Sequence, residues 1–339
     1  MKNINWSELG FGYFKTDYNV RCEYKDGKWG ELYATEDVNM NIHMASTCLH
    51  YGQEVFEGLK AFRGADGKVR LFRVEENAKR MINSGEYLKM AVPSVELFTK
   101  ACIEAVKLNA DYIPPYGSGA SLYLRPMLIG VGPQVGVKPS ADYLFAVFVT
   151  PVGPYYKDGF NCIKVIIDYD HDRAAPKGTG HVKVGGNYAA SLDSGEIAHQ
   201  KGFASVIFLD PATKQYIDEC SAANFFGIRD GKYITPDSHS VLPSITNKSL
   251  RQIAEDLGLK VEQRKVGVEE LPTFSEAGCC GTAAVISPIG SVYDPKTDKT
   301  IVYGDGKTAW SQKLYKTLQG IQYGEIEDKH NWNTIVDVK

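Results

Sequence analysis

Apolar residues recur at helical spacing in several segments of the chain. In the segment 95–109, for example, Ala101, Ala105 and Leu108 fall on one side of a helix. Ser94 stands directly before this segment and is predicted to cap it, because a serine side chain can accept a hydrogen bond from a first-turn N–H group. The same spacing predicts helices over 75–88, 189–198, 245–257 and 310–323.

Continuous apolar runs and one turn motif predict strands. The run Tyr143–Val149 is apolar throughout, which is typical of a strand buried on both faces. Arg229-Asp230-Gly231 separates two short apolar segments and predicts a β-hairpin. The predicted strands are 121–129, 141–149, 162–168, 204–210, 224–228 and 232–235. In the second half of the chain strands alternate with helices, so the sequence predicts an α/β protein.

The segment Thr150–Gly159 is the best candidate for a linker. It holds two prolines and two glycines in ten residues, a composition typical of loops. The chain has 339 residues, a length that favours two domains over one. We therefore predict a domain boundary at this segment.

Composition and charge exclude several classes of protein. Hydrophobic residues make up 43% of the chain and charged residues 23%, as in an ordinary globular protein. The net charge of −3 and the absence of a basic block argue against nucleic acid as a partner. We expect neither a membrane-spanning helix, which requires an apolar run of about 20 residues, nor a signal peptide at the N-terminus.

The cysteines and histidines favour a cytoplasmic protein without a metal site. The seven cysteines are odd in number and scattered, and no Cys-x-x-Cys motif occurs. We therefore expect reduced thiols in the cytoplasm. The seven histidines form no His-x-x-x-His motif, so no zinc site is expected.

The segment His181–Tyr188 carries the most informative candidate for chemistry. Lys183 stands just before the pair Gly185-Gly186, ahead of an apolar-periodic run. We predict a turn at this pair, where a ligand can approach the main chain closely. A sheltered lysine can attack carbonyl groups, because partial burial lowers its pKa. On spacing alone, a solvated lysine is the more common interpretation.

Six further blocks accompany this segment. Upstream are HYGQEVFEGLKAFRG (50–64), ENAKRM (76–81) and LYLRP (122–126), and downstream are DECSAANFF (218–226), LPSITNKSL (242–250) and GTAAVISP (281–288). In this order the blocks resemble the class IV aminotransferases, which use pyridoxal phosphate. EVFEGLKAFRG and LYLRP resemble the branched-chain amino acid aminotransferases in particular. The resemblance covers nearly the whole chain.

This resemblance implies a fold, a reaction and an assembly. The fold is that of fold type IV pyridoxal phosphate enzymes, an α/β (α+β) protein of two domains. A smaller N-terminal α/β domain (1–152) would be followed by a linker (153–161) and a larger C-terminal pseudo-barrel domain that binds the cofactor (162–339). The reaction would be reversible transfer of the amino group of leucine, isoleucine or valine to 2-oxoglutarate. The family implies a homodimer.

The resemblance also implies which residues bind pyridoxal phosphate. Lys183 matches the family's Schiff-base lysine, and Glu219 matches the glutamate that pairs with the protonated pyridine nitrogen. Arginine suits a phosphate because its planar guanidinium group can donate to two oxygens at once. A helix N-terminus also suits a phosphate, because its free N–H groups can donate to the anion. The residues that match the phosphate contacts are Arg80, Ile245, Thr246 and Thr282, and Tyr188 matches the contact to the phenolic oxygen.

A largely aromatic substrate pocket is implied as well. The residues that match its wall are Phe11, Phe56, Tyr123 and Tyr155, with Arg125 near the mouth. Tyr51, Val135 and Val137 match residues that reach the partner subunit's site. The substrate α-carboxylate is expected at the backbone N–H groups of Thr282 and Ala283.

Two departures from the family pattern concern regulation and phosphate binding. Ala284 and Ser287 hold the positions of a redox Cys-x-x-Cys found in animal enzymes, and Ala222 replaces a threonine that contacts the phosphate. Two rival functions stay open. A D-amino acid aminotransferase or an aminodeoxychorismate lyase shares the lysine and glutamate but usually lacks EVFEGLKAF and LYLRP. A cofactor-binding protein without catalysis would be yellow yet turn over no amino acid.

Overall fold

The computed structural model describes residues 2–153, 160–304 and 309–338, and the chain divides into two compact units. The first unit comprises Met1–Tyr155, Val182–Gly185 and Gly320–Lys339, and the second comprises the rest of the chain. The sequence assigns residues 182–185 and 320–339 to the C-terminal domain, and the structure differs there. Both segments bond to strands of the first unit, which local sequence patterns do not reveal.

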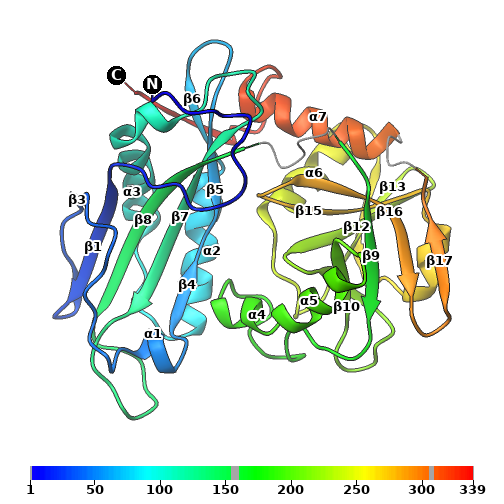
Figure 1. The fold of residues 1–339 in the computed structure, drawn as a ribbon, viewed down its shortest axis with the longest axis horizontal. Coiled ribbons are helices and arrows are strands. Elements are labelled where there is room, and N and C mark those ends of the chain that lie inside the picture. Colours follow the sequence, from blue (N-terminus) through cyan, green and yellow to red (C-terminus); the bar gives the residue numbers. More distant parts are fainter. Residues whose placement is uncertain (1, 154–159, 305–308, 339) are drawn as a thin grey trace. The chain divides into compact units, whose positions relative to one another are not determined.

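A nine-stranded antiparallel sheet forms the first unit (Figure 1). Its order is β18-β6-β5-β7-β8-β1-β2, with β3 paired to β1 and β4 paired to β7. The strands are β1 (Asn19–Lys25), β2 (Lys28–Trp29), β3 (Tyr33–Thr35), β4 (Glu54–Phe56), β5 (Leu59–Arg63), β6 (Val69–Phe72), β7 (Ser121–Gly130), β8 (Tyr143–Val152) and β18 (Asn333–Val336).

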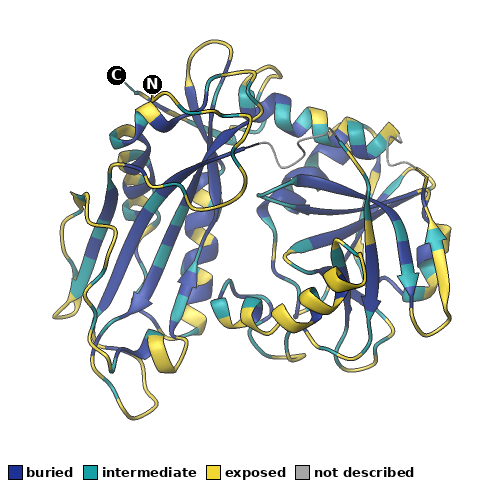
Figure 2. Ribbon diagram, in the orientation of Figure 1, coloured by how far each residue is buried: buried dark blue, intermediate teal, exposed yellow. Residues whose placement is uncertain are grey.

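Helices α2 (Val74–Tyr87) and α3 (Val95–Leu108) pack against this sheet. They bring Met81 and Phe98 into one hydrophobic core with β7 and β8, which Figure 2 shows buried along most of their length. The predicted cap of α3 is confirmed, because the Ser94 hydroxyl accepts a hydrogen bond from a first-turn N–H group (3.1 Å). The short helix α1 (Thr47–His50) and a 3₁₀ turn (Ala110–Tyr112) complete the unit's helices among the described residues.

Strand β8 continues through Val152, so the linker predicted from composition at Thr150–Gly159 begins too early. Pro151 pairs with Leu122 of β7. A proline has no N–H group to donate and is tolerated where a strand needs none. Strand β1 pairs with β8 from Tyr143 to Val147, and Pro151 lies beyond that pairing. Residues 154–159 of the predicted linker lie outside the described residues.

The second unit contains a closed, barrel-like sheet. Its order is β11-β10-β9-β16-β15-β12-β13-β14, and an additional β11–β12 pairing joins six of these strands into a ring. Ile207, Phe225 and Val292 belong to the core of this sheet. The ring confirms the predicted pseudo-barrel. The strands are β9 (Ile163–Asp168), β10 (Ser205–Leu209), β11 (Ile217–Cys220), β12 (Ala223–Arg229), β13 (Lys232–Pro236), β14 (Lys260–Arg264), β15 (Glu276–Gly281), β16 (Val285–Asp294) and β17 (Lys299–Val302).

Local turn chemistry in this sheet follows the sequence. The predicted hairpin at Arg229-Asp230-Gly231 is confirmed, since β12 and β13 pair from Gly227–Ile234 to Arg229–Lys232. Asp230 and Gly231 both adopt positive φ angles (50° and 69°), which aspartate tolerates and glycine favours.

The remaining helices are α4 (Gly185–Ala189), α5 (Leu192–Gln200), α6 (Ile245–Asp256), α7 (Ala309–Tyr323) and a 3₁₀ helix (Val268–Thr273). Helices α5, α6 and α7 correspond to predicted segments, whereas α4 and the 3₁₀ helix were not predicted. The predicted turn at Gly185-Gly186 is wrong, because α4 begins at Gly185 and includes both glycines. Among the helices in the described part of the chain, none combines the length and apolar character needed to span a membrane.

Candidate active site

Three hydrogen bonds of the main chain flank Lys183 in the first unit. The Lys183 N–H group donates to Ser84 Oγ (3.0 Å), and the Lys183 carbonyl accepts from the Phe56 N–H group (3.1 Å). The Gly185 N–H group, at the first residue of helix α4, donates to Glu54 Oε1. The lysine side chain is half-buried, and its Nζ lies 4.7 Å from the centroid of the Phe56 ring. The lysine is therefore sheltered, as the sequence predicts.

Four of the residues predicted for the substrate pocket cluster in this unit, and Phe56 joins them to Lys183. The ring centroids of Phe11 and Tyr123 are 5.0 Å apart in an edge-to-face contact. The Arg125 guanidinium lies 4.9 Å from the Phe56 centroid and donates to the Tyr123 hydroxyl (3.1 Å). Its Nε is buried and has no hydrogen-bond partner among the described residues. Such a donor suits an anionic ligand group.

Arg80 is buried rather than exposed on its helix. It forms a two-point ion pair with Glu57, through Nε (2.7 Å) and Nη2 (2.7 Å). Asn77 donates to the same carboxylate (2.8 Å). Because both charges are buried and paired, the orientation of the guanidinium is fixed. Sequence reasoning did not identify Glu57, although it lies inside the EVFEG block.

Lys60 is a second sheltered amine that sequence reasoning did not identify. It lies on β5 and is buried, and burial lowers its pKa to about 8. A buried amine with a lowered pKa is a candidate nucleophile in its own right. Lys177, the lysine nearest to Lys183 in the sequence, is exposed.

Glu219 is buried in β11 of the second unit, with 2% of its surface exposed. Its Oε1 bonds Arg173 (2.5 Å) and accepts from the Leu242 N–H group (3.2 Å), while Oε2 accepts from Asn224 (3.0 Å). Burial raises the pKa of Glu219 to about 7, even though Arg173 and the hydrogen bonds favour the ionised form. Sequence reasoning missed Arg173, which lies outside the seven blocks.

Side-chain amides connect Glu219 to the first turn of α6. Asn247 donates to Asn224 (3.2 Å), which in turn donates to Glu219. Ser244 caps the helix by accepting from the Asn247 N–H group (3.2 Å). Ile245 and Thr246, both buried, are the first two residues of the helix, where N–H groups lack an acceptor within the helix. The sequence prediction that they open a helix is confirmed, and this end suits an anion.

Thr282 and Ala283 lie in the hairpin turn between β15 and β16, since Gly281 pairs with Val285. Val285, directly after the turn, has a φ of +66°. This left-handed conformation is rare for a β-branched residue and costs on the order of 1–3 kcal/mol. Strained backbone of this kind is concentrated at binding sites.

The residues predicted to reach a partner subunit lie together in the first unit. The Tyr51 hydroxyl donates to the Val135 carbonyl. Val135 and Val137 are 83% and 85% exposed. Of the other predicted residues, Tyr188 is half-buried in α4, and Tyr155 lies outside the described residues.

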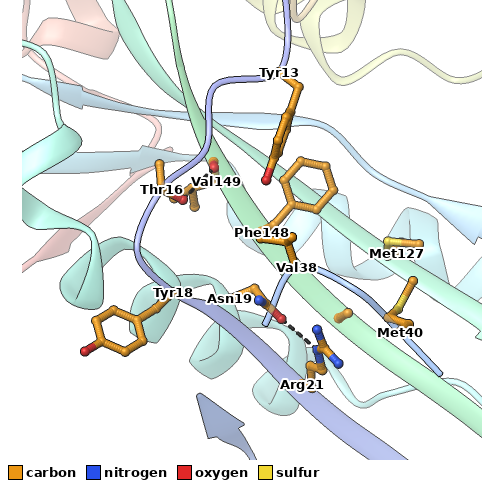
Figure 3. A pocket seen from close by; sticks show the side chains of 11 residues that line it. Tyr13, Thr16, Tyr18, Asn19, Arg21, Val38, Met40, Met127, Phe148 and Val149 are labelled. Atoms are coloured by element: carbon orange, nitrogen blue, oxygen red, sulfur yellow. Dashed lines mark hydrogen bonds between the residues drawn. The ribbon is translucent and has the colours of Figure 1, made fainter. Parts of the chain in front are cut away.

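A cavity of about 380 Å³ in the first unit is separate from all these groups (Figure 3). Tyr13 and Phe148 meet edge to face there, with centroids 6.1 Å apart, and Arg21 donates to Asn19 (2.7 Å). None of the described residues predicted for the site lines this cavity. Among the described residues, no cluster of histidine, cysteine and acidic side chains could hold a metal ion.

Comparisons with known proteins place the sequence and the fold in one family. The family model described as amino-transferase class IV matches residues 54–292. The branched-chain-amino-acid aminotransferase of Haemophilus influenzae is 49% identical over 347 residues, covering 98% of each chain. The structure of the branched-chain amino acid aminotransferase from Escherichia coli is 30% identical, with a TM-score of 0.75 over 95% of this chain and 100% of that one. A third structure is that of the T.th. branched-chain amino acid aminotransferase complexed with N-(5′-phosphopyridoxyl)-L-glutamate. It is 26% identical, with a TM-score of 0.77, and the match covers 96% of this chain and 100% of that one.

Proposed function

The chain belongs to the class IV amino-transferase family, and we propose that it exchanges the amino group between L-leucine, L-isoleucine or L-valine and 2-oxoglutarate. The products are a branched-chain 2-oxo acid and L-glutamate. The full-length similarity to a branched-chain-amino-acid aminotransferase supports this over a D-amino acid aminotransferase or an aminodeoxychorismate lyase. The observation that carries the proposal is the sheltered Lys183 beside an aromatic cluster that contains Arg125.

The described residues fit pyridoxal phosphate as the cofactor. This group supplies an aldehyde that a lysine amine can bond and a ring that accepts electrons. In the second unit, Glu219 Oε2 can accept a further hydrogen bond, as carboxylate oxygens do, and so suits a protonated ring nitrogen. The first N–H groups of α6, at Ile245 and Thr246, suit the phosphate. The phosphopyridoxyl group in the related complex is of this chemical class.

Each unit contributes defined tasks. In the first, Lys183 would bond the cofactor and then, once freed by the substrate, carry the proton away from the substrate's α-carbon. Arg80 would bind the phosphate, held in place by Glu57. In the second, Glu219 would keep the ring nitrogen protonated, because a nearby carboxylate favours the charged form.

The remaining cofactor and substrate contacts follow the same division. Thr282 would bind the phosphate, and its N–H group with that of Ala283 would bind the substrate α-carboxylate. Tyr188 would bond the phenolic oxygen of the cofactor. The rings of Phe11, Phe56 and Tyr123 offer an apolar wall to a branched side chain, while Arg125 supplies hydrogen-bond donors to the distal carboxylate of glutamate. Tyr155 would complete the wall.

A homodimer is part of this proposal. Val135 and Val137 are strongly exposed apolar side chains, and Tyr51 bonds the same loop. Clustered exposed apolar groups mark protein interfaces, and these three residues would reach the partner's substrate. The cytoplasm is the proposed location, because all seven cysteines are free thiols.

The experiment that tests this function is an amino-donor panel. Purified protein loaded with pyridoxal phosphate is mixed with 2-oxoglutarate and individual L- and D-amino acids, and glutamate formation is measured. We expect turnover with leucine, isoleucine and valine. A preference for D-alanine or L-aspartate would refute the substrate class, and cofactor binding without turnover of any donor would refute catalysis.

A further inference from the structure

We propose that Glu54 and Ser84 are positioning residues that hold the main chain on both sides of Lys183, so that its amine stays over the Phe56 ring. This inference rests on the proposed role of Lys183 as the cofactor lysine. No motif match assigns a role to either residue, although Glu54 belongs to the EVFEG block.

Ser84 fixes the chain on the N-terminal side of the lysine side chain. It is 1% exposed in α2, and its Oγ accepts the Lys183 N–H group (3.0 Å). Ser84 lies four residues after Arg80, so both side chains project from one face of the helix. Arg80 is itself fixed by its buried ion pair with Glu57. Helix α2 therefore sets the distance between the proposed phosphate arginine and the backbone of the proposed cofactor lysine.

Glu54 fixes the chain on the C-terminal side. Glu54 and Phe56 are alternate residues of β4, so their side chains project from one face of the strand. The Glu54 carboxylate accepts the Gly185 N–H group, and the Phe56 N–H group binds the Lys183 carbonyl (3.1 Å). A Cβ added at Gly185 would meet the Glu54 carboxylate, which would then have to move away from the Gly185 N–H group.

Because these bonds hold the backbone of Lys183, only the torsion angles of its side chain remain free to adjust. Proton transfer depends steeply on geometry, and a misplacement of about 1 Å can cost on the order of a hundredfold in rate. Removing either acceptor frees the backbone of Lys183 without touching its amine. The consequence is a lower kcat at nearly unchanged substrate affinity, because ground-state binding does not use these acceptors.

A matched pair of substitutions at Glu54 separates the hydrogen bond from the charge. Glu54→Gln keeps an oxygen that can accept the Gly185 N–H group, whereas Glu54→Ala removes it. Ser84→Ala removes the second acceptor. Glu75→Ala, at an exposed position of the same α2 helix as Ser84, serves as the control. Thermal unfolding and cofactor content are recorded for every variant.

Three readouts are measured on these proteins. They are kcat and KM with leucine, the pH midpoint of the absorbance change of the cofactor-loaded protein, and the reductive methylation of Lys183 relative to exposed Lys177 in the cofactor-free protein. For Glu54→Ala and Ser84→Ala we expect kcat to fall about tenfold or more, with KM within about threefold. The pH midpoint and the relative methylation of Lys183 should both change. Glu54→Gln and Glu75→Ala should match the wild type in all three.

Two outcomes overturn the inference. One is a folded Glu54→Ala variant with wild-type kcat, pH midpoint and methylation. The other is a folded Glu54→Gln variant whose kcat falls as far as that of Glu54→Ala, since the charge of Glu54 would then matter rather than its hydrogen bond. If Ser84→Ala does not fold, the Glu54 pair decides. Failure of the proposed function is distinguishable, because borohydride reduction of the wild type would then leave Lys183 unlabelled.

Discussion

Replacing Glu219 by glutamine should change how the stability of the cofactor-free protein depends on pH. Burial raises the pKa of Glu219 to about 7 in the folded protein, against an ordinary value of 4.5. Below the ordinary value the carboxyl group is protonated in both the folded and the unfolded chain. As the pH rises from about 4.5 to 7, the unfolded chain releases this proton first, so folding loses stability across that window. The glutamine variant has no such proton.

The magnitude follows from the two pKa values. The difference is 7 − 4.5 pH units, and each unit corresponds to about 1.4 kcal/mol, so the effect is on the order of 3 kcal/mol. Solvent screening does not reduce this much, because the side chain is 2% exposed. The substitution also leaves Arg173 without its carboxylate partner, which costs stability. Arg173 pairs with a carboxylate only when Glu219 is ionised, and this pairing is already included in the pKa of about 7.

The assay is denaturant unfolding of both cofactor-free proteins at several pH values from about 4 to 8. The free energy of unfolding of Glu219→Gln minus that of the wild type should rise by on the order of 3 kcal/mol between about pH 4.5 and 7, then level off. Burial also raises the pKa of the neighbouring Asp218, to about 6, but Asp218 is present in both proteins and its contribution largely cancels. A flat difference for Glu219→Gln would refute the buried, destabilised carboxylate.

The remaining predictions concern specificity and oxidation. Phe56→Ala should lower kcat/KM more for leucine than for glutamate, since a buried methylene contributes about 0.8 kcal/mol, while Arg125→Ala should show the opposite bias. Equal losses for both donors in both variants would contradict this division. Treatment with peroxide should cause no loss of activity that a thiol then restores. Ala284 and Ser287 replace a Cys-x-x-Cys, and burial raises the pKa of Cys280 well above its ordinary value. A thiol-reversible disulfide that controls the activity would contradict it.

Elements fixed by local chemistry were predictable from the sequence. Ser94 caps α3 because a serine directly before a helix can accept a hydrogen bond from a first-turn N–H group. The Asp230-Gly231 pair turns the chain because both residues tolerate positive φ angles. The predicted opening of α6 at Ile245 is likewise local. Four of the predicted pocket residues cluster, and Phe56 joins them to Lys183, although the match to a family pattern named them rather than spacing.

Features that depend on distant pairs were not predictable. Lys183 bonds Ser84 across 99 residues of chain, and its segment bonds Glu54 across 131. The same holds for β18, whose pairing with β6 joins the end of the chain to its first third. Arg173 lies in no recognisable motif, and its role as the counterion of Glu219 is visible only once the fold brings them together.

Borohydride reduction of the cofactor-loaded protein, followed by peptide mapping, tests the assignment of Lys183 most directly. Reduction converts the bond between a lysine and pyridoxal phosphate into a stable phosphopyridoxyl group, which adds a defined mass to one peptide. We expect this mass on the peptide that contains Lys183, and no specific labelling in Lys183→Ala. A label on Lys177, or on Lys60 with its buried amine, would contradict the assignment.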